Sequence, residues 1–311
     1  MFKKLNFKTL VLIFGGLLAI VVIMQVVKHS SGDRNFKDKL FTVDTAKVST
    51  IILMPRSEKS EIRLVRSGNS WTMAVKGKTY KIENGYVQDM LRILPQMKPE
   101  RVVATEKSEW PNYQVTDTAS VRVKVEQGTK VVADFLVGKF SYTQYKQTTF
   151  VRPFDEDEVY AIDGFLAMIF NKSANDLRNK SLVNVNPSDI TRLTFTYPAD
   201  SSCVLIKNDK LWKINSEKAD SAKVANYLSY LSNASGDDFA DNSVPSGKPV
   251  LSVKIEGKNF NPIEINAFVA DNTNKYTLIS SINPDNKFSG AKYNLIQRIF
   301  LGPKQFKIIP K

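Results

Sequence analysis

The sequence predicts an α+β protein in which one N-terminal transmembrane helix precedes two tandem repeats of an antiparallel-sheet-plus-helix domain. An uncharged apolar stretch near the N-terminus predicts the transmembrane helix. Similar segments recur 141 residues apart, as Trp71 and Trp212 do, and this spacing predicts two repeats. Within each repeat, segments with strand character come in runs instead of alternating with helices, which is typical of antiparallel sheets in α+β folds.

The apolar stretch covers residues 9–27, with the sequence TLVLIFGGLLAIVVIMQVV. As a helix it would reach roughly 28 Å, which matches the hydrocarbon thickness of a bilayer. Residues 1–8 carry three lysines and no acidic residue, so we expect this short tail to stay in the cytoplasm. Everything after a juxtamembrane linker, 28–35, would then lie on the other side. A cleaved secretory signal is the alternative, but its apolar core is only about 7 to 15 residues long.

Composition predicts a folded, basic protein with few residues suited to metal binding or catalysis. Hydrophobic residues make up 42% of the 311 residues, and the formal net charge is +13. The lysines are scattered and form no nucleic-acid patch, so a solvated basic surface is the favoured interpretation. If that surface has a target, anionic lipid, an anionic envelope polymer or an acidic protein face fits better than nucleic acid. Cys203 is the only cysteine, so it cannot form an internal disulfide, and the only histidine, His29, lies at the predicted membrane exit without a partner for a triad or a metal site. One histidine and one cysteine leave little for binding zinc, iron or copper. We therefore expect no metal and no cofactor.

The clearest part of the repeat is a strand hairpin. Residues 62–73, IRLVRSGNSWTM, align without a gap on residues 203–214, CVLIKNDKLWKI. Each segment reads as an alternating strand, a turn that contains Asn, and a second strand that opens near a tryptophan. Because Trp71 and Trp212 occupy equivalent positions, we expect both to seal the core of their repeats. The alternative is that they are platforms on which sugars stack.

The order of elements after the hairpin is also the same in both repeats. Asn84 and Ser221 are N-cap types, and each precedes an apolar stripe with helical spacing: Val87, Leu91 and Leu94, then Val224, Leu228 and Leu231. Further segments follow in corresponding order: strands at 121–125 and 251–255, strands at 149–151 and 277–279, and final helices at 164–170 and 291–300. The predicted repeats therefore span 36–170 and 177–311, joined by a linker at 171–176.

One aromatic segment of the first repeat, 139–148, has no counterpart of equal form in the second. It contains Phe140, Tyr142 and Tyr145. These three residues are the candidate contact surface for a partner.

Catalytic patterns are weak. The densest group of carboxylates is the run 155–158, DEDE, with Asp163 beyond it. Two facing acids could hydrolyse a glycosidic bond, but four acids in a row after Pro153 are more typical of a solvated turn. Neither a glycine-rich phosphate loop nor a serine nucleophile elbow is present in the exported part. We predict no catalytic residues and no enzyme activity.

Several short motifs stand out in the chain: DLRNKSL at 176–182, NPSDITRL at 186–193, ERVV at 100–103, NYQV at 112–115, and Trp71 after its turn. Together they resemble the motifs of a bacterial family that is known only as domain of unknown function 4340. The family usually has Tyr-Gly-Leu where this chain has Tyr113-Gln114-Val115. The second repeat has no equivalent of ERVV or of the tyrosine motif, so it is the more divergent half.

The resemblance implies an envelope protein, with one membrane helix, of the kind encoded beside ABC-type transporter subunits for gliding motility or export. On this basis we expect a non-enzymatic accessory or scaffold subunit in the bacterial inner membrane, with the N-terminus cytoplasmic and the bulk of the chain periplasmic. Its partner would be an ABC-type permease, contacted through the anchor helix and the exported domains, with no small-molecule substrate. The alternative is a protein that binds or hydrolyses an envelope polymer, either peptidoglycan or polysaccharide.

Overall fold

Strands make up most of the protein. The computed structural model describes residues 14–18, 20–21, 37–58, 60–199, 201–209, 211–270 and 275–308. Seventeen strands lie in these residues, and every pairing recorded between them is antiparallel. The predicted α+β class is wrong, because the helices are short and the chain is mostly β. After the helical residues near the N-terminus, the helices are α2 (Asn84–Ile93), α3 (Trp110–Tyr113), α4 (Leu166–Phe170), α5 (Ala174–Leu177), α6 (Ser221–Leu231) and α7 (Leu295–Ile299).

The predicted transmembrane helix at 9–27 is also corrected. Among the described residues, no helix has both the length and the apolar character that crossing a bilayer requires. A span needs about 20 apolar helical residues, and the described helical residues of this stretch are 14–18 and 20–21. Its other residues, and most of the predicted tail and linker, lie outside the described residues. The predicted location, an inner-membrane protein with one span and a periplasmic body, depended on that helix and is corrected with it.

The chain divides into two compact units. Unit 1 comprises the chain up to Val48 and Met90–Phe170, and unit 2 comprises Ser49–Asp89 and the chain from Asn171 onward. The predicted repeats, 36–170 and 177–311, follow the internal similarity of the sequence. Compactness groups the residues differently, because 49–89 belong with the C-terminal part.

Unit 1 is built on five antiparallel strands in the order β6-β7-β8-β9-β5. Alternation in β6 is as the sequence predicts: Val121, Val123 and Val125 are fully buried, while the basic residues between them are half-exposed. Phe135 of β7 stacks on Phe41 and meets the ring of Phe170 in α4 edge-on. The strands are β5 (Pro99–Ala104), β6 (Val121–Gln127), β7 (Lys130–Thr143), β8 (Lys146–Pro153) and β9 (Val159–Asp163).

Unit 2 begins with an antiparallel meander in the order β4-β3-β2-β1. Gly68 lies in the tight turn between β2 and β3 with φ of 59°. Lys76 and Gly77 form the turn before β4, both with positive φ, as a hairpin with this twist requires. The strands are β1 (Thr50–Met54), β2 (Ile62–Ser67), β3 (Ser70–Val75) and β4 (Lys78–Lys81).

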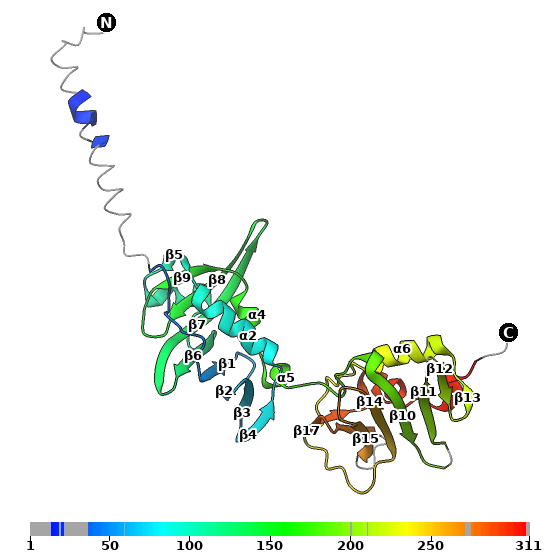
Figure 1. Cartoon of the computed structure of the whole chain (residues 1–311). Coiled ribbons are helices and arrows are strands. Elements are labelled where there is room, and N and C mark those ends of the chain that lie inside the picture. Colours follow the sequence, from blue (N-terminus) through cyan, green and yellow to red (C-terminus); the bar gives the residue numbers. More distant parts are fainter. Residues whose placement is uncertain are drawn as a thin grey trace. The chain divides into compact units, whose positions relative to one another are not determined.

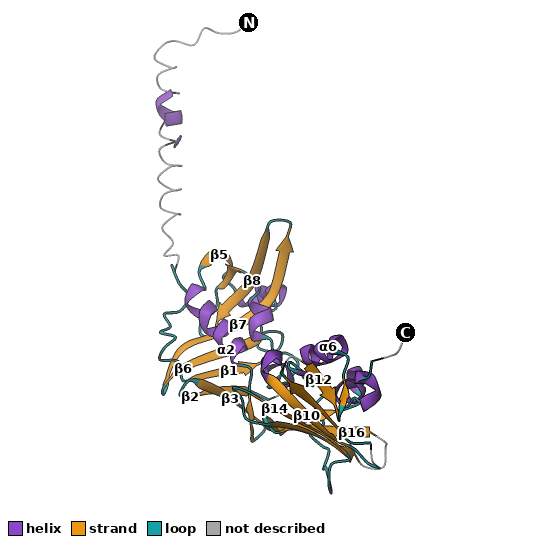
Figure 2. Ribbon diagram, turned by 45° about the vertical axis from the view of Figure 1, so that its right-hand side comes forward, coloured by secondary structure: helices purple, strands orange, loops and turns teal. Residues whose placement is uncertain are grey.

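The rest of unit 2 is an eight-stranded sheet with the order β13-β12-β11-β10-β14-β15-β16-β17. Helix α6 lies across this sheet (Figures 1 and 2) and buries Val224, Tyr227, Leu228 and Leu231 in its core. The strands are β10 (Ile190–Thr196), β11 (Cys203–Asn208), β12 (Leu211–Ile214), β13 (Glu217–Lys218), β14 (Leu251–Gly257), β15 (Ile263–Ala270), β16 (Lys275–Ser280) and β17 (Asn283–Ser289). Cys203 is buried in this core, and burial raises the pKa of its thiol to about 11.

The two tryptophan hairpins have matching registers. Arg66 is opposite Trp71 in β2–β3, and Lys207 is opposite Trp212 in β11–β12. Trp71 is 6% exposed and Trp212 is 8% exposed. Both rings are therefore largely out of reach of a polymer in solution.

Helix boundaries differ from the predicted ones by small amounts. The N-cap of α6 is Asp220, one residue before the predicted Ser221, because the Asp220 carboxylate accepts from the N–H groups of Ala222 and Lys223. In α2 the buried stripe runs through Val87 and Met90 to Leu94, and Leu91 is only half-buried. The predicted final helices shorten to α4 and, after a 3₁₀ turn at Lys292–Asn294, to α7.

The backbone conformation of Gln114 explains why the family usually has glycine at this position. It caps α3 in the left-handed conformation, with φ of 55° and ψ of 38°, and its side chain is exposed. Glycine adopts this conformation without steric cost, whereas other residues pay about 1 kcal/mol or more.

We therefore expect Gln114→Gly to raise the free energy of unfolding by about 1 kcal/mol, because it removes this cost. Urea unfolding of the full chain measures the change. Gln114→Ala keeps a side chain in the left-handed conformation and serves as the control, with no gain expected. A glycine variant no more stable than the alanine variant would show that the conformation is not strained here.

Candidate functional site

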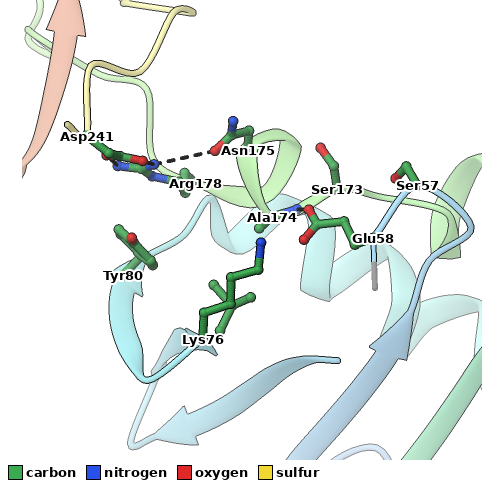
Figure 3. Close-up of a pocket in the computed structure, with 10 residues that line it drawn as sticks. Ser57, Glu58, Lys76, Tyr80, Ser173, Ala174, Asn175, Arg178 and Asp241 are labelled. Atoms are coloured by element: carbon green, nitrogen blue, oxygen red, sulfur yellow. Dashed lines mark hydrogen bonds and ion pairs between the residues drawn. The ribbon is translucent and has the colours of Figure 1, made fainter. Parts of the chain in front are cut away.

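The larger of two notable hollows lies in unit 2 and has a volume of about 540 Å³. Figure 3 shows that its walls come from the loop after β1, the β3–β4 turn, the segment that contains α5, and the loop of Asp241. Its lining residues are mostly polar: Ser57, Glu58, Val75, Lys76, Tyr80, Ser173, Ala174, Asn175, Arg178 and Asp241.

Arg178 is the central residue of this pocket, and its side chain is only 2% exposed. Its guanidinium makes two parallel bonds to Asp241, of 2.7 Å from Nη1 and 2.8 Å from Nη2. Nε donates to Oδ1 of Asn286 at 2.9 Å, Nη2 also donates to that oxygen, and Nη1 donates to Asn175 at 3.4 Å. All five N–H donors of the buried cation therefore have acceptors, as burial of a charge requires.

Two aromatic rings lie against the same guanidinium. Its central carbon lies 3.7 Å from the ring centroid of Phe239 and 4.3 Å from that of Tyr80. These contacts add cation–π attraction to the ion pair and exclude water from it. Hydrogen bonding to Arg178 is the main cause that holds the pKa of Asp241 below its ordinary value of 3.8.

A buried amide network extends from Arg178 into β17. Asn286 donates to the backbone oxygen of Asn179 at 3.0 Å and to Asn283 at 2.9 Å. Asn283 donates to the same backbone oxygen at 2.8 Å. Arg178 and Asn179 belong to the motif at 176–182, so the motif fixes the chain entering the second sheet onto the last strand of that sheet.

Other groups of the pocket are also largely engaged. Glu58 accepts from the backbone N–H of Ala174 at 2.6 Å, and Ser173 with Asp176 forms a capping box at the start of α5. The Lys76 ammonium points into the pocket in Figure 3. In the part of the chain that the structure describes, no three His, Cys, Asp or Glu side chains are grouped so that they could hold a metal ion. The pocket therefore lies where several segments of unit 2 are held together, and the residues at its opening are mostly polar.

The second candidate is the predicted aromatic segment, which lies at the end of the β7–β8 hairpin in unit 1. In Figures 1 and 2 this end projects as a two-stranded arm. We call residues 139–147 the arm. Phe140 is 51% exposed, Tyr142 is 65% exposed and Tyr145, in the turn, is 92% exposed. All three predicted contact residues thus present aromatic surface to solvent.

Phe165, just before α4, supports the arm from one side. Its ring meets Phe140 edge-on, with ring centroids 5.4 Å apart, and stacks on Tyr142 with centroids 6.5 Å apart. Exposed Met168 of α4 adds apolar surface to this unit. A second hollow, of about 340 Å³, is lined by Tyr142, Gln144, Tyr145, Lys146, Gln147 and Asp163.

The acidic run at 155–158 lies in the turn between β8 and β9. Glu156 pairs with Lys37, and Asp157 lies 3.6 Å from the ammonium of Lys107. Buried Arg152 donates to the backbone oxygen of Glu156 at 3.0 Å and stacks on Trp110 at 3.6 Å. Cations and backbone bonds thus hold this turn in place.

Sequence reasoning missed the role of Arg178, although it singled out the motif that contains this residue. An arginine two residues before Lys180 reads as part of a solvated basic stretch. The only available signal was its position after Leu177 in a motif shared with a family. Its acceptors Asp241 and Asn286 lie 63 and 108 residues further along the chain, so no local pattern connects them.

We expect Arg178→Lys to lower the free energy of unfolding by about 3 kcal/mol, because lysine cannot form the paired bonds and leaves Asp241 and Asn286 poorly matched. Urea unfolding provides the measurement. Arg192→Lys is the matched control, since Arg192 is half-exposed and lies 3.7 Å from Glu256. That control should change the free energy by less than about 0.5 kcal/mol. Equal effects of the two variants would refute the central role of Arg178.

The ion pair also predicts a pH dependence. The folded-state pKa of Asp241 is below 3.8, so its contribution to stability is present above that value and is lost as the pH falls through the folded-state pKa. Asp241→Asn should therefore be less stable than the wild type at pH 7, and the difference should narrow below pH 3.8. Urea midpoints measured from neutral to acid pH test this. A difference that stays constant with pH would contradict it.

Comparison with known protein families gives a match over the middle of the chain. The family model described as domain of unknown function (DUF4340) matches residues 74–250. The matched region contains the arm, the motif at 176–182 and Asp241. No curated protein and no solved structure matches the chain significantly. Because the family model covers more than half of the sequence, this chain belongs to the DUF4340 family.

Proposed function

We propose that this chain is a non-enzymatic accessory or scaffold subunit that binds another protein, and that its partner is a permease subunit of an ABC-type transporter. The family carries no assigned function, so the class of partner comes from the resemblance to proteins encoded beside such transporters. The observation that carries the proposal is the arm, where three large aromatic side chains are exposed together.

Exposed aromatic residues of this kind are typical of protein interfaces. Tyrosine, phenylalanine and methionine are enriched at binding surfaces, and tyrosine is among the residues that often contribute most of the binding energy. Phe140 and Tyr142 rest on Phe165 and are thereby restrained before a partner arrives. Tyr145 at the turn is almost fully exposed and is the first side chain that an approaching surface would meet.

The pocket of Arg178 supports the same proposal, because its central group is already engaged within unit 2. Its buried cation is matched by Asp241, Asn286 and Asn175, so this group is committed to holding unit 2 together. The residue that the family motif places at the centre of the pocket thus has a structural task. Binding is better assigned to a surface whose groups have no such task.

A second candidate function is binding of an envelope polysaccharide on the same arm. The hollow beside Tyr142 and Tyr145 contains amides and the Asp163 carboxylate, a combination of groups that suits sugar hydroxyls. The tryptophans and the acidic turn, which the sequence suggested for this function, are less suited to it. Both tryptophans are buried, and the turn is held by cations and backbone hydrogen bonds.

The test removes the two tyrosines together. Tyr142→Ser with Tyr145→Ser should reduce co-purification of the permease with the full chain in mild detergent by at least about tenfold, because hot-spot aromatics carry much of an interface's energy. Circular dichroism and urea unfolding should remain close to wild type, since both side chains are exposed. Val244→Ser, at a residue 72% exposed in unit 2, is the control and should leave capture unchanged.

Undiminished capture by the double variant would refute the role of the arm in the proposed function. Retention of the wild type on peptidoglycan or polysaccharide, without any permease, would favour the second candidate.

A further inference from the structure

Strand β7 is longer than the strand beside it. Its pairing with β6 begins at Lys130 and ends at Val137, opposite Val121. Its pairing with β8 continues to Thr143, opposite Lys146. No strand in the described part of the chain pairs with β7 beyond Val137 on the β6 side. The outer half of β7 therefore has one occupied edge and one open edge.

The hairpin register shows which backbone groups face the open edge. Gln144 and Tyr145 form a two-residue turn, so Thr143 and Lys146 are a hydrogen-bonded pair and the pairs alternate from there. Tyr142 opposite Gln147, and Phe140 opposite Thr149, are then pairs without hydrogen bonds between β7 and β8. The Gly164 N–H donates to the Gln147 oxygen at 2.9 Å, on the β9 side, as this alternation requires.

It follows that the N–H and C=O groups of Phe140 and Tyr142 point away from β8, toward the open edge. Below them one face of the strand is covered: a Cβ placed on Gly138 would lie only 2.2 Å from the backbone oxygen of Tyr113. Gly138 itself is buried. From Phe140 to Thr143, all residues are exposed.

The two faces of this edge differ in chemistry. Phe140 and Tyr142 lie on one face, against Phe165. Alternation places Lys139, Ser141 and Thr143 on the other face. The Lys139 ammonium lies near the rings of Tyr113 and Phe150, at 5.7 and 6.0 Å from their centroids, and forms no ion pair with any residue that the structure describes. An added strand would meet aromatic surface on one face and a positive charge on the other.

We propose that the open edge of β7, from Phe140 to Thr143, accepts an extended segment of the partner protein as an added strand, and that this segment alternates apolar with acidic side chains. Phe140 and Tyr142 would each donate and accept one backbone hydrogen bond, which gives affinity without regard to side-chain identity. Apolar side chains of the added strand would pack on the aromatic face, and acidic ones would face Lys139. This inference rests on the proposed function, because it specifies how the same arm binds.

The experiment uses the full chain and a fluorescent synthetic peptide of about eight residues in which Val and Glu alternate, a length that covers the edge. Anisotropy should show binding of this peptide and at least fivefold weaker binding of the matching Val/Lys peptide. Tyr142→Pro should lose at least tenfold more affinity than Tyr142→Thr. Both variants remove the ring, but only proline removes the outward N–H, and it breaks no bond to β8.

A second pair of variants leaves the backbone untouched. Lys139→Glu should weaken binding of the Val/Glu peptide about fivefold and reverse the preference between the two peptides, because it reverses the charge of one face. Lys130→Glu, at the other end of the same strand, is the control and should have no effect. This pair keeps the proposal testable if the proline variant proves unstable.

Three results would overturn the edge proposal: equal affinities of the proline and threonine variants, equal binding of the two peptides, or no peptide binding while the permease still co-purifies. In the last case the proposed function stands and only the added strand fails. Peptide binding without any permease capture would overturn the proposed function and leave the edge intact. Self-association of the wild type that only Tyr142→Pro abolishes would assign the edge to a second copy of the chain.

Discussion

Unit 2 depends on the burial of one positive charge. A guanidinium out of water is tolerated only when every donor is matched and the counter-charge is close, since an unpaired buried charge costs several kcal/mol. Arg178 meets this condition with acceptors from three places: α5, the loop of Asp241, and β17. The same contacts fix the segment at 176–182 against Asn283 and Asn286. A family motif that looks like a solvated basic stretch is thus the point at which unit 2 is fastened.

The arm in unit 1 differs from the Arg178 site, because some of its polar backbone groups have no hydrogen-bond partner in any neighbouring strand that the structure describes. Where Arg178 has every donor occupied, the outer half of β7 leaves backbone groups open on one edge and aromatic side chains largely exposed. Such an edge costs little in water, because water satisfies its N–H and C=O groups, but it is a template for another strand. Natural sheets usually protect long edges with charge or twist. Here Lys139 supplies the charge, and the register shift between Val137 and Phe140 sets the arm apart from the rest of β7.

Local patterns in the sequence predicted much of the strand structure but little of the candidate site around Arg178. Alternation identified β6, and the aligned hairpins of Trp71 and Trp212 have matching registers. The fold class was wrong, because helical stripes that look substantial in sequence form short helices among the seventeen strands of the described residues. The acceptors of Arg178 could not be found, since contacts 63 and 108 residues apart leave no local periodicity. The aromatic arm was identified, but its open edge was not, because that edge depends on where β6 begins.

The support beneath the arm explains why binding there need not be weak. When a strand joins a flexible edge, both partners lose conformational entropy. When the edge is already restrained, only the incoming segment has to be ordered. Contacts of Phe140 and Tyr142 with Phe165, and the close approach of Gly138 to Tyr113, hold the arm at its base and along one face. Lys146 is tied to Glu100 at 2.7 Å. The open edge is therefore held in strand geometry before a partner arrives, and backbone hydrogen bonds to it would be gained at lower entropic cost.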